Sequence, residues 1–180
     1  MLATAADNNL SILKRKPSDL QRYIAWTNQT KAEYGNITNF VCQEKLHWQP
    51  LPSSTAETGP LFVYKDPRPF AAREDYKILL NDWPYGFAEG IVHIVVWLKT
   101  RIPVQEPEGF LLPESERILR AFVQEKFLNS LKRAGLDAED RVQWFKNWVS
   151  LQSVRGLDHF HVLARDIPPS VIAEWTSNPE

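Results

Sequence analysis

The sequence predicts an α+β domain in which helices flank a mainly antiparallel sheet. Residues 91–98 (IVHIVVWL) are β-branched and apolar on both faces, which is typical of a central strand. Residues 154–165 include an alternating stretch that favours a second strand. Between these segments, apolar side chains recur at helical spacing over residues 114–134. A strand, a long helix and a returning strand together indicate a sheet with helices packed on it.

The composition is that of a globular chain with an ordinary core. The 180 residues are 43% hydrophobic and 24% charged, and the net charge of −1 gives no general attraction to nucleic acid or membranes. The single cysteine, Cys42, excludes an intrachain disulfide and suits a reducing compartment. No apolar run approaches the ~18 residues of a membrane span. We expect a soluble cytoplasmic protein with no membrane partner, in which residues 1–16 form a flexible tail and residues 17–180 a single domain.

The N-terminal half predicts two helices and two short strands. The tail ends in a basic cluster, residues 14–16, which is typical of a solvated segment. Pro17 and Gly35 mark the start and end of a helix. Asn36 is placed to cap a second helix, with apolar side chains at Ile37, Phe40, Val41 and Leu46. Residues 61–64 and 76–80 favour strands.

The C-terminal half alternates strands and helices. The strand at residues 91–98 puts His93 on the same face as Val95 and Trp97. The long helix over residues 114–134 is predicted to end at Gly135. Asp137 is placed to cap a further helix whose inward side chains are Val142, Phe145 and Val149. After the strand at residues 154–165, a proline pair opens a short helix that ends near Trp175.

The alternating stretch carries two histidines one residue apart. In a strand, His159 and His161 share a face with Leu157 and Leu163, while Asp158 and its alternate neighbours face the other way. The pair could be two hydrogen-bonded histidines without chemistry. Two imidazoles could equally supply a nucleophile, an acid/base pair or metal ligands.

The order and content of two segments resemble the histidine-triad nucleotide-binding fold. The first segment runs from Leu-Asn-Asp-Trp-Pro at residues 80–84 through His93 to Lys99, and the second contains His-Phe-His-Val-Leu at residues 159–163. The resemblance implies that His159 takes the place of the catalytic middle histidine. Leu157 stands where the first triad histidine would be, so the triad is one member short. This departure weighs against simple nucleotide hydrolysis.

Most of the chain is similar to the fungal N-acetylglucosamine-induced protein family. The similarity is carried by Asn-Asp-Trp-Pro-Tyr-Gly at residues 81–86, by residues 16–26, 34–38 and 93–99, and by residues 151–163. Members of that family include arginine-containing cyclodipeptide synthases, which join arginine from arginyl-tRNA to a second amino acid. The resemblance therefore implies an aminoacyltransferase whose partners are arginyl-tRNA and a second aminoacyl-tRNA.

Such chemistry needs a base or nucleophile, acidic groups for a guanidinium, and cations for phosphate. The candidate catalytic residues are His159, His161 and His93. The candidate substrate-binding residues are Asn81, Asp82, Trp83, Tyr85, Glu89, Trp97 and Asp158, with Asp82 the first choice for the guanidinium because it lies in the family block. The candidate phosphate or tRNA contacts are Lys99, Arg101, Arg155 and Arg165. We expect no cofactor and no metal.

Three alternatives stay open from the sequence. The first is a histidine-triad-like nucleotide hydrolase or nucleotidyl transferase that uses His159. The second is a non-catalytic sensor for a sugar nucleotide such as UDP-N-acetylglucosamine. The third is a metal site made by His93, His159 and His161, which only their number supports. Neither the second amino acid nor the oligomeric state follows from the sequence.

Overall fold

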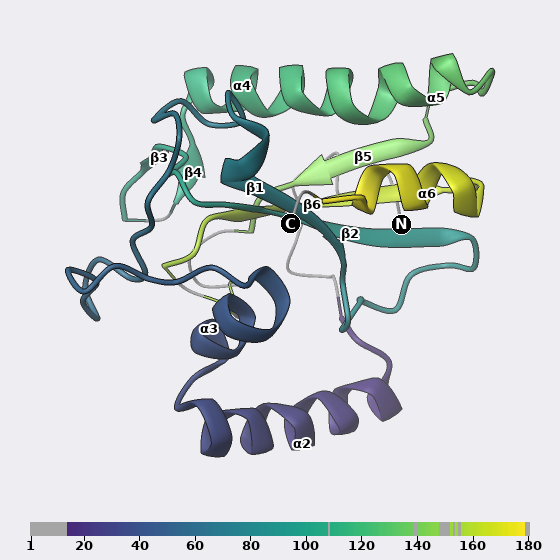
Figure 1. The fold of residues 1–180 in the computed structure, drawn as a ribbon. Helices are drawn as coiled ribbons and strands as arrows, with labels where there is room; N and C mark the ends of the chain where they lie inside the picture. Colours follow the sequence, from purple (N-terminus) through teal and green to yellow (C-terminus); the bar gives the residue numbers. More distant parts are fainter. Residues whose placement is uncertain are drawn as a thin grey trace.

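The protein is built on a four-stranded antiparallel sheet with the strand order β1-β2-β6-β5 (Figure 1). The computed structural model describes residues 14–107, 109–138, 140–147, 152, 154 and 156–178. The strands are β1 (Tyr76–Leu80), β2 (Ile91–Leu98), β5 (Val142–Phe145) and β6 (His159–Arg165). The predicted α+β class with an antiparallel sheet is confirmed. The two histidine-bearing strands, β2 and β6, are the central pair.

Helices and turns account for most of the remaining described chain. Before the sheet come α2 (Pro17–Tyr34), α3 (Ile37–Phe40), the π-helical turn η2 (Val41–Leu46) and the 3-10 turn η3 (Arg73–Asp75). A small hairpin, β3 (Val104–Gln105) and β4 (Phe110–Leu111), precedes the long helix. That helix consists of α4 (Pro113–Val123), the π-helical turn η4 (Gln124–Leu128) and α5 (Asn129–Arg133), and α6 (Pro169–Thr176) follows β6.

Local sequence explains where the first helices begin and end. Gly35 ends α2 with a φ of 80°, a left-handed value that glycine adopts without strain. The side chain of Asn36 accepts a hydrogen bond from the backbone N–H of Asn39 at 2.8 Å and so caps α3. The predicted start and end of these helices are therefore confirmed.

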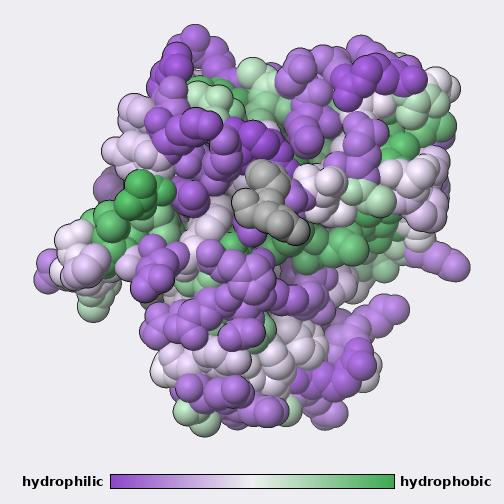
Figure 2. Space-filling model, in the orientation of Figure 1, coloured by the Kyte–Doolittle hydropathy of each residue, from purple (hydrophilic) through white to green (hydrophobic). Residues whose placement is uncertain are grey.

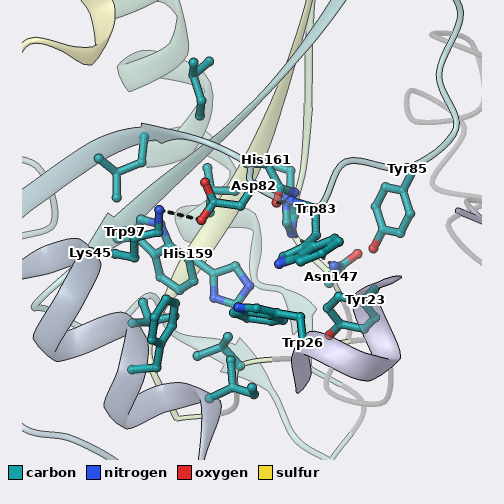
Figure 3. A pocket seen from close by; sticks show the side chains of 18 of the residues that line it. Tyr23, Trp26, Lys45, Asp82, Trp83, Tyr85, Trp97, Asn147, His159 and His161 are labelled. Carbon is teal, nitrogen blue, oxygen red and sulfur yellow. Dashed lines mark hydrogen bonds and ion pairs between the residues drawn. The ribbon is translucent and has the colours of Figure 1, made fainter. Parts of the chain in front are cut away.

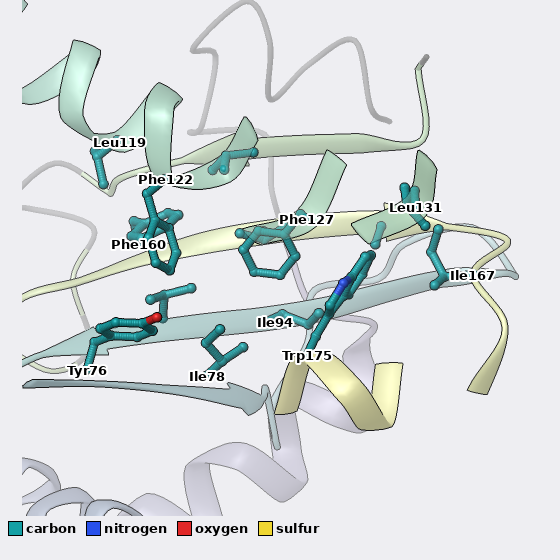
Figure 4. Close-up of a cluster of buried hydrophobic side chains, with 14 of the residues drawn as sticks. Tyr76, Ile78, Ile94, Leu119, Phe122, Phe127, Leu131, Phe160, Ile167 and Trp175 are labelled. Carbon is teal, nitrogen blue, oxygen red and sulfur yellow. The ribbon is translucent and has the colours of Figure 1, made fainter. Parts of the chain in front are cut away.

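The helices cover opposite faces of the sheet (Figure 1). The long helix and α6 pack on one face, where Phe127 and Trp175 are fully buried against Ile94 and Phe160 (Figure 4). α3 and η2 pack on the other face, around a second core of buried apolar side chains that includes Leu157. Because side chains alternate along a strand, the histidines of β2 and β6 lie in this second layer.

Two predicted elements are wrong. Residues 61–64 form no strand: Phe62 packs on Trp48, and the backbone N–H groups just after the segment donate to the Asp75 carboxylate instead of to a neighbouring strand. The helix predicted after Asp137 is the strand β5. Val142 and Trp144 pack on the long-helix side and Phe145 on the histidine side, which is strand periodicity. Val149 lies outside the described residues.

Three further features concern the visible surface, the helices and the N-terminus. Figure 2 shows hydrophilic side chains over most of the visible face, with hydrophobic ones in smaller groups between them. No described helix is both long and apolar enough to cross a lipid bilayer. Residues 1–13 lie outside the described residues, and the predicted boundary at residue 16 stays a prediction, although Lys14 is hydrogen-bonded to the loop after β1.

Candidate functional site

A cavity of about 100 Å³ lies between the N-terminal helices and the histidine face of the sheet (Figure 3). Seven of the predicted site residues line it: Asn81, Asp82, Trp83, Tyr85, Trp97, His159 and His161. Because β1 ends at Leu80, the segment that follows turns over the strand ends and brings its polar side chains to the opening. The structure therefore brings the two predicted halves of the site into one cavity.

Aromatic side chains form the walls. The ring centroids of Trp26 and Trp83 are 5.2 Å apart, and Tyr23 lies edge-on to Trp83 at 5.5 Å. Trp97 lies 4.6 Å from His159, its directly paired neighbour on the adjacent strand. Such walls offer flat apolar surfaces on which a planar ligand group can stack.

His159 lines the cavity, and among the described residues no hydrogen bond is found at its Nε2. Its Nδ1 lies 2.8 Å from the backbone oxygen of Leu157. A carbonyl oxygen only accepts, so Nδ1 carries the proton and Nε2 keeps its lone pair. Burial lowers the pKa of His159 to about 4, and the Lys146 charge adds to this lowering. The imidazole is therefore neutral at physiological pH, which suits a nucleophile or a group that first accepts a proton.

His161 belongs instead to a hydrogen-bonded row that crosses the sheet. Asn81 Nδ2 lies 3.1 Å from His93 Nδ1, His93 Nε2 lies 2.9 Å from His161 Nδ1, and His161 Nε2 lies 3.1 Å from the amide of Asn147. The row thus joins residues on or next to β1, β2, β6 and β5 in turn.

With neutral imidazoles, the hydrogen bonds of the row can run from donor to acceptor in only one direction. The backbone N–H of Trp83 donates to Asn81 Oδ1 at 2.9 Å, which fixes the orientation of that amide. Asn81 then donates to His93 Nδ1, His93 Nε2–H donates to His161 Nδ1, and His161 Nε2–H needs an acceptor. We therefore assign the amide oxygen of Asn147 to that nitrogen, because amide orientation follows from the hydrogen-bond network.

This arrangement keeps His93 and His161 neutral. Burial lowers the pKa of His93 to about 3, with a further lowering from the Arg15 charge. Burial, and then the neighbouring His93, lower the pKa of His161 well below its usual range. The two imidazoles use ring nitrogens on each other, and among the described residues no group of three histidine, cysteine or acidic side chains is arranged to hold a metal ion.

One ion pair lies at the cavity opening. Lys45 Nζ is 2.6 Å from Asp82 Oδ2, and the two side chains are 37% and 48% exposed. A pair exposed to this degree contributes little to stability. A ligand guanidinium can therefore replace the lysine ammonium on Asp82 at small cost.

Seven predicted site residues do not line the cavity or lie outside the described chain, and one of them is His93, which belongs to the hydrogen-bonded row. Asp158 is not among the lining residues and forms a 3.0 Å ion pair with buried Lys146. Arg101 donates to the backbone oxygens of Gly156 and Thr58 and lies near Asp158. Glu89, Lys99 and Arg165 are not among the lining residues either, and Arg155 lies outside the described residues.

The sequence did not single out several residues that complete the cavity. They are Arg15, Tyr23, Trp26, Lys45 and Asn147. Arg15 sits in the basic cluster interpreted as solvated, and Trp26 lies on a helix with an unremarkable apolar pattern. Asn147 follows a strand that was predicted as a helix, so its position next to His161 could not be foreseen.

The fold and cavity define an α+β protein whose candidate site is an aromatic-walled pocket around neutral histidines. The chain belongs to the family described as "Protein of unknown function (DUF3605)", which matches residues 2–165.

The chain is also similar to named relatives and to one solved structure. The chain is similar to "N-acetylglucosamine-induced protein 1" of Candida albicans, with 28% identity over 180 residues that cover 94% of this chain and 68% of that protein. An uncharacterized Saccharomyces cerevisiae protein, YPL067C, is 36% identical over 95 residues, 52% of this chain and 46% of its own length. The crystal structure of HTC1 aligns with a TM-score of 0.68 and 28% identity, covering 93% of this chain and 83% of that one.

These relatives support the resemblance to the N-acetylglucosamine-induced protein family. Their names do not mention cyclodipeptide synthesis, and the resemblance to the histidine-triad fold stays a prediction.

Proposed function

We propose that this protein is a tRNA-dependent cyclodipeptide synthase that joins arginine, delivered as arginyl-tRNA, to a second amino acid. The observation that supports this most directly is the His159 imidazole, which lines an aromatic-walled cavity and whose Nδ1 proton is bound by the Leu157 carbonyl, so that the lone pair is on Nε2. A neutral, buried imidazole can accept a proton from an attacking amine without competing protonation by solvent.

The other parts of the cavity supply the remaining needs of the reaction. The terminal adenosine of tRNA stacks on the tryptophan walls, as bases do on exposed aromatic side chains. The guanidinium of the arginyl group binds Asp82 in place of Lys45. Trp83 and Trp97 exclude water from the acyl ester, which limits hydrolysis.

The proposed reaction consists of two acyl transfers. The α-amine of one aminoacyl group attacks the ester carbonyl of the other, an amide forms, and the 3′-terminal ribose hydroxyl of one tRNA leaves. The remaining α-amine attacks the second ester and closes the diketopiperazine ring, which releases the second tRNA. In each step His159 Nε2 takes the proton of the attacking amine and returns it to the leaving ribose oxygen.

Product formation tests this proposal. The protein is incubated with arginine, each of the other amino acids in turn, tRNA, ATP and the synthetases, and cyclo(Arg-X) is sought by mass spectrometry. We expect product from the wild type and a loss of at least about 100-fold in His159→Ala, the scale of acid–base catalysis. His47→Asn is the matched control, because His47 is exposed, lies outside the cavity and has the left-handed backbone that asparagine tolerates. Absence of product with every amino acid would refute the proposal.

The same His159 geometry also favours a second candidate, nucleotidyl transfer. An imidazole whose Nδ1–H is held by a backbone carbonyl can attack an α-phosphate through Nε2. This function predicts a nucleotidyl group on His159, visible as a gain in intact mass with a nucleoside phosphoramidate, and loss of turnover in His159→Ala but not in Asp82→Ala. A large thermal shift with UDP-N-acetylglucosamine and no turnover of any substrate would instead support a sugar-nucleotide sensor.

A further inference from the structure

The basic segment Lys14–Lys16 is held beside the cavity by the loop after β1, and its Arg15 lines the cavity. The backbone N–H of Gly86 donates to the Lys14 carbonyl oxygen at 2.9 Å. A Cβ on Gly86 would lie 3.2 Å from Cγ of Lys16 and 3.4 Å from the Lys14 oxygen, so the absence of a side chain there allows the close approach. The segment is thus fixed to the same loop that carries Trp83 and Tyr85.

This contact directs Arg15 into the site. The guanidinium carbon lies 3.8 Å from the centroid of the Tyr23 ring and 5.4 Å from that of Tyr85, and Arg15 is one of the lining residues. Two aromatic faces therefore fix the plane of the guanidinium. The positive charge of Arg15 also acts on the histidine row, because it contributes to the lowered pKa of His93.

The Arg15 side chain has a buried donor without an acceptor. Its Nε is buried and has no hydrogen-bond partner among the described residues. None of the ion pairs found in the described part of the chain includes Arg15. Of the described residues that line the cavity, Asp82 alone has a carboxylate, and Lys45 already pairs with it. An unsatisfied buried donor on a cation is costly, which indicates that an anion is missing.

We propose that Arg15 and the backbone turn that holds it form a phosphate-binding subsite for a nucleotide whose base stacks on the tryptophan walls. This inference rests on the proposed function and deepens it, because the 3′ end of tRNA would supply both the base and the phosphate. A phosphate matches the planar donor set of a guanidinium. It would also lie beside neutral imidazoles, which do not compete with Arg15 for the negative charge.

The phosphate could come from a free nucleotide or from an RNA end, and binding measurements separate these sources. Calorimetry at low salt compares adenosine, AMP and the oligonucleotide ACCA on the wild type and on Arg15→Gln. Arg22→Gln is the matched control, because it removes a guanidinium from α2 that is 73% exposed, pairs with Asp19 and does not line the cavity. Gly86→Val tests the segment without altering Arg15 itself, since the new side chain displaces residues 14–16.

We expect the wild type to bind AMP about tenfold more tightly than adenosine, the scale of one charge-assisted hydrogen bond. Arg15→Gln and Gly86→Val should lose this preference while binding adenosine normally, and Arg22→Gln should keep it. If the source is an RNA end, ACCA should bind more tightly than AMP, and Arg15→Gln should reduce its salt dependence by about one ion.

The inference is overturned if adenosine and AMP bind equally to the wild type, if Arg15→Gln keeps the preference for AMP, or if Arg22→Gln loses it as well. An Arg15-dependent preference for AMP without any cyclodipeptide product would support the subsite and refute the proposed function. Cyclodipeptide formation by Arg15→Gln with an unchanged KM for both tRNAs would refute the subsite alone.

Discussion

Acidification should destabilise the fold through the buried histidines. His93 and His159 have pKa values of about 3 and about 4 in the folded protein, because burial disfavours the imidazolium. The unfolded chain has the ordinary value of about 6.5. As the pH falls below that value, the unfolded state takes up protons that the folded state does not, so the stability present above pH 6.5 is lost on the way down to the folded pKa values.

The expected magnitude follows from the pKa values. A pH of 5 is about 1.5 units below the pKa of each imidazole in the unfolded chain. It is still above the pKa of His93 and of His159 in the folded protein. At about 1.4 kcal/mol per unit, each costs about 2 kcal/mol. Together they remove about 4 kcal/mol, a large part of the 5–15 kcal/mol that stabilises a typical domain. His161, whose pKa is also lowered by burial, adds a loss in the same direction.

Urea unfolding at pH 7.5 and pH 5.0 measures this effect, and the comparison with His159→Gln isolates one histidine from the carboxylates that titrate in the same range. The variant should lose about 2 kcal/mol less than the wild type between the two pH values. His47→Asn controls for the removal of a histidine that is exposed. Equal losses in wild type and His159→Gln would refute the view that His159 is held neutral by burial.

Three further predictions concern buried polar groups. Lys146→Met should lower the free energy of unfolding by about 3 kcal/mol, because Asp158 loses its 3.0 Å partner and the two side chains are only 4% and 14% exposed. An unchanged urea midpoint would contradict this. Ser130→Ala should lower the free energy of unfolding by about 1–2 kcal/mol, since the buried Trp175 indole N–H donates to the Ser130 hydroxyl at 3.0 Å. Calorimetric unfolding measures this loss, and Ser130→Cys should recover part of it. Cys42 should not react with a thiol reagent at pH 8 until the protein unfolds, because burial raises the pKa of its thiol to about 11. Rapid labelling of the native protein would contradict this prediction, since it would show that the thiol is accessible.

Hydrophobic periodicity was enough to predict the central strands and the long helix, and the limits of the prediction have physical causes. Residues 91–98 could be recognised as a strand because every side chain except His93 is apolar or β-branched, whereas residues 142–145 mix two periods. Val142 and Phe145 are three apart, as on a helix, and only pairing with β6 selects the strand in which Trp144 joins the core. Pairing with a distant strand is a tertiary effect that local spacing does not contain.

The site shows the same division between local and long-range information. Residues 81–85 could be found because they directly follow a strand. The two histidines of β6 could be found because alternate residues of a strand share a face. Arg15 could not, since its position depends on one backbone hydrogen bond to Gly86, far along the chain. Arg101, a cation that the sequence suggested for phosphate, binds backbone oxygens and lies near Asp158.

The polar row from Asn81 to Asn147 also bears on how the sheet avoids pairing errors. If β2 or β6 slipped by one residue, His93 or His161 would turn into the layer occupied by Ile94 and Phe160. An imidazole buried there would have no hydrogen-bond partner, at a cost of about 1–3 kcal/mol for each unsatisfied group. Apolar strands alone tolerate such slippage poorly but do not forbid it. The histidines therefore penalise misaligned pairing, and the same side chains that shape the cavity help to give the folding chain a single alignment.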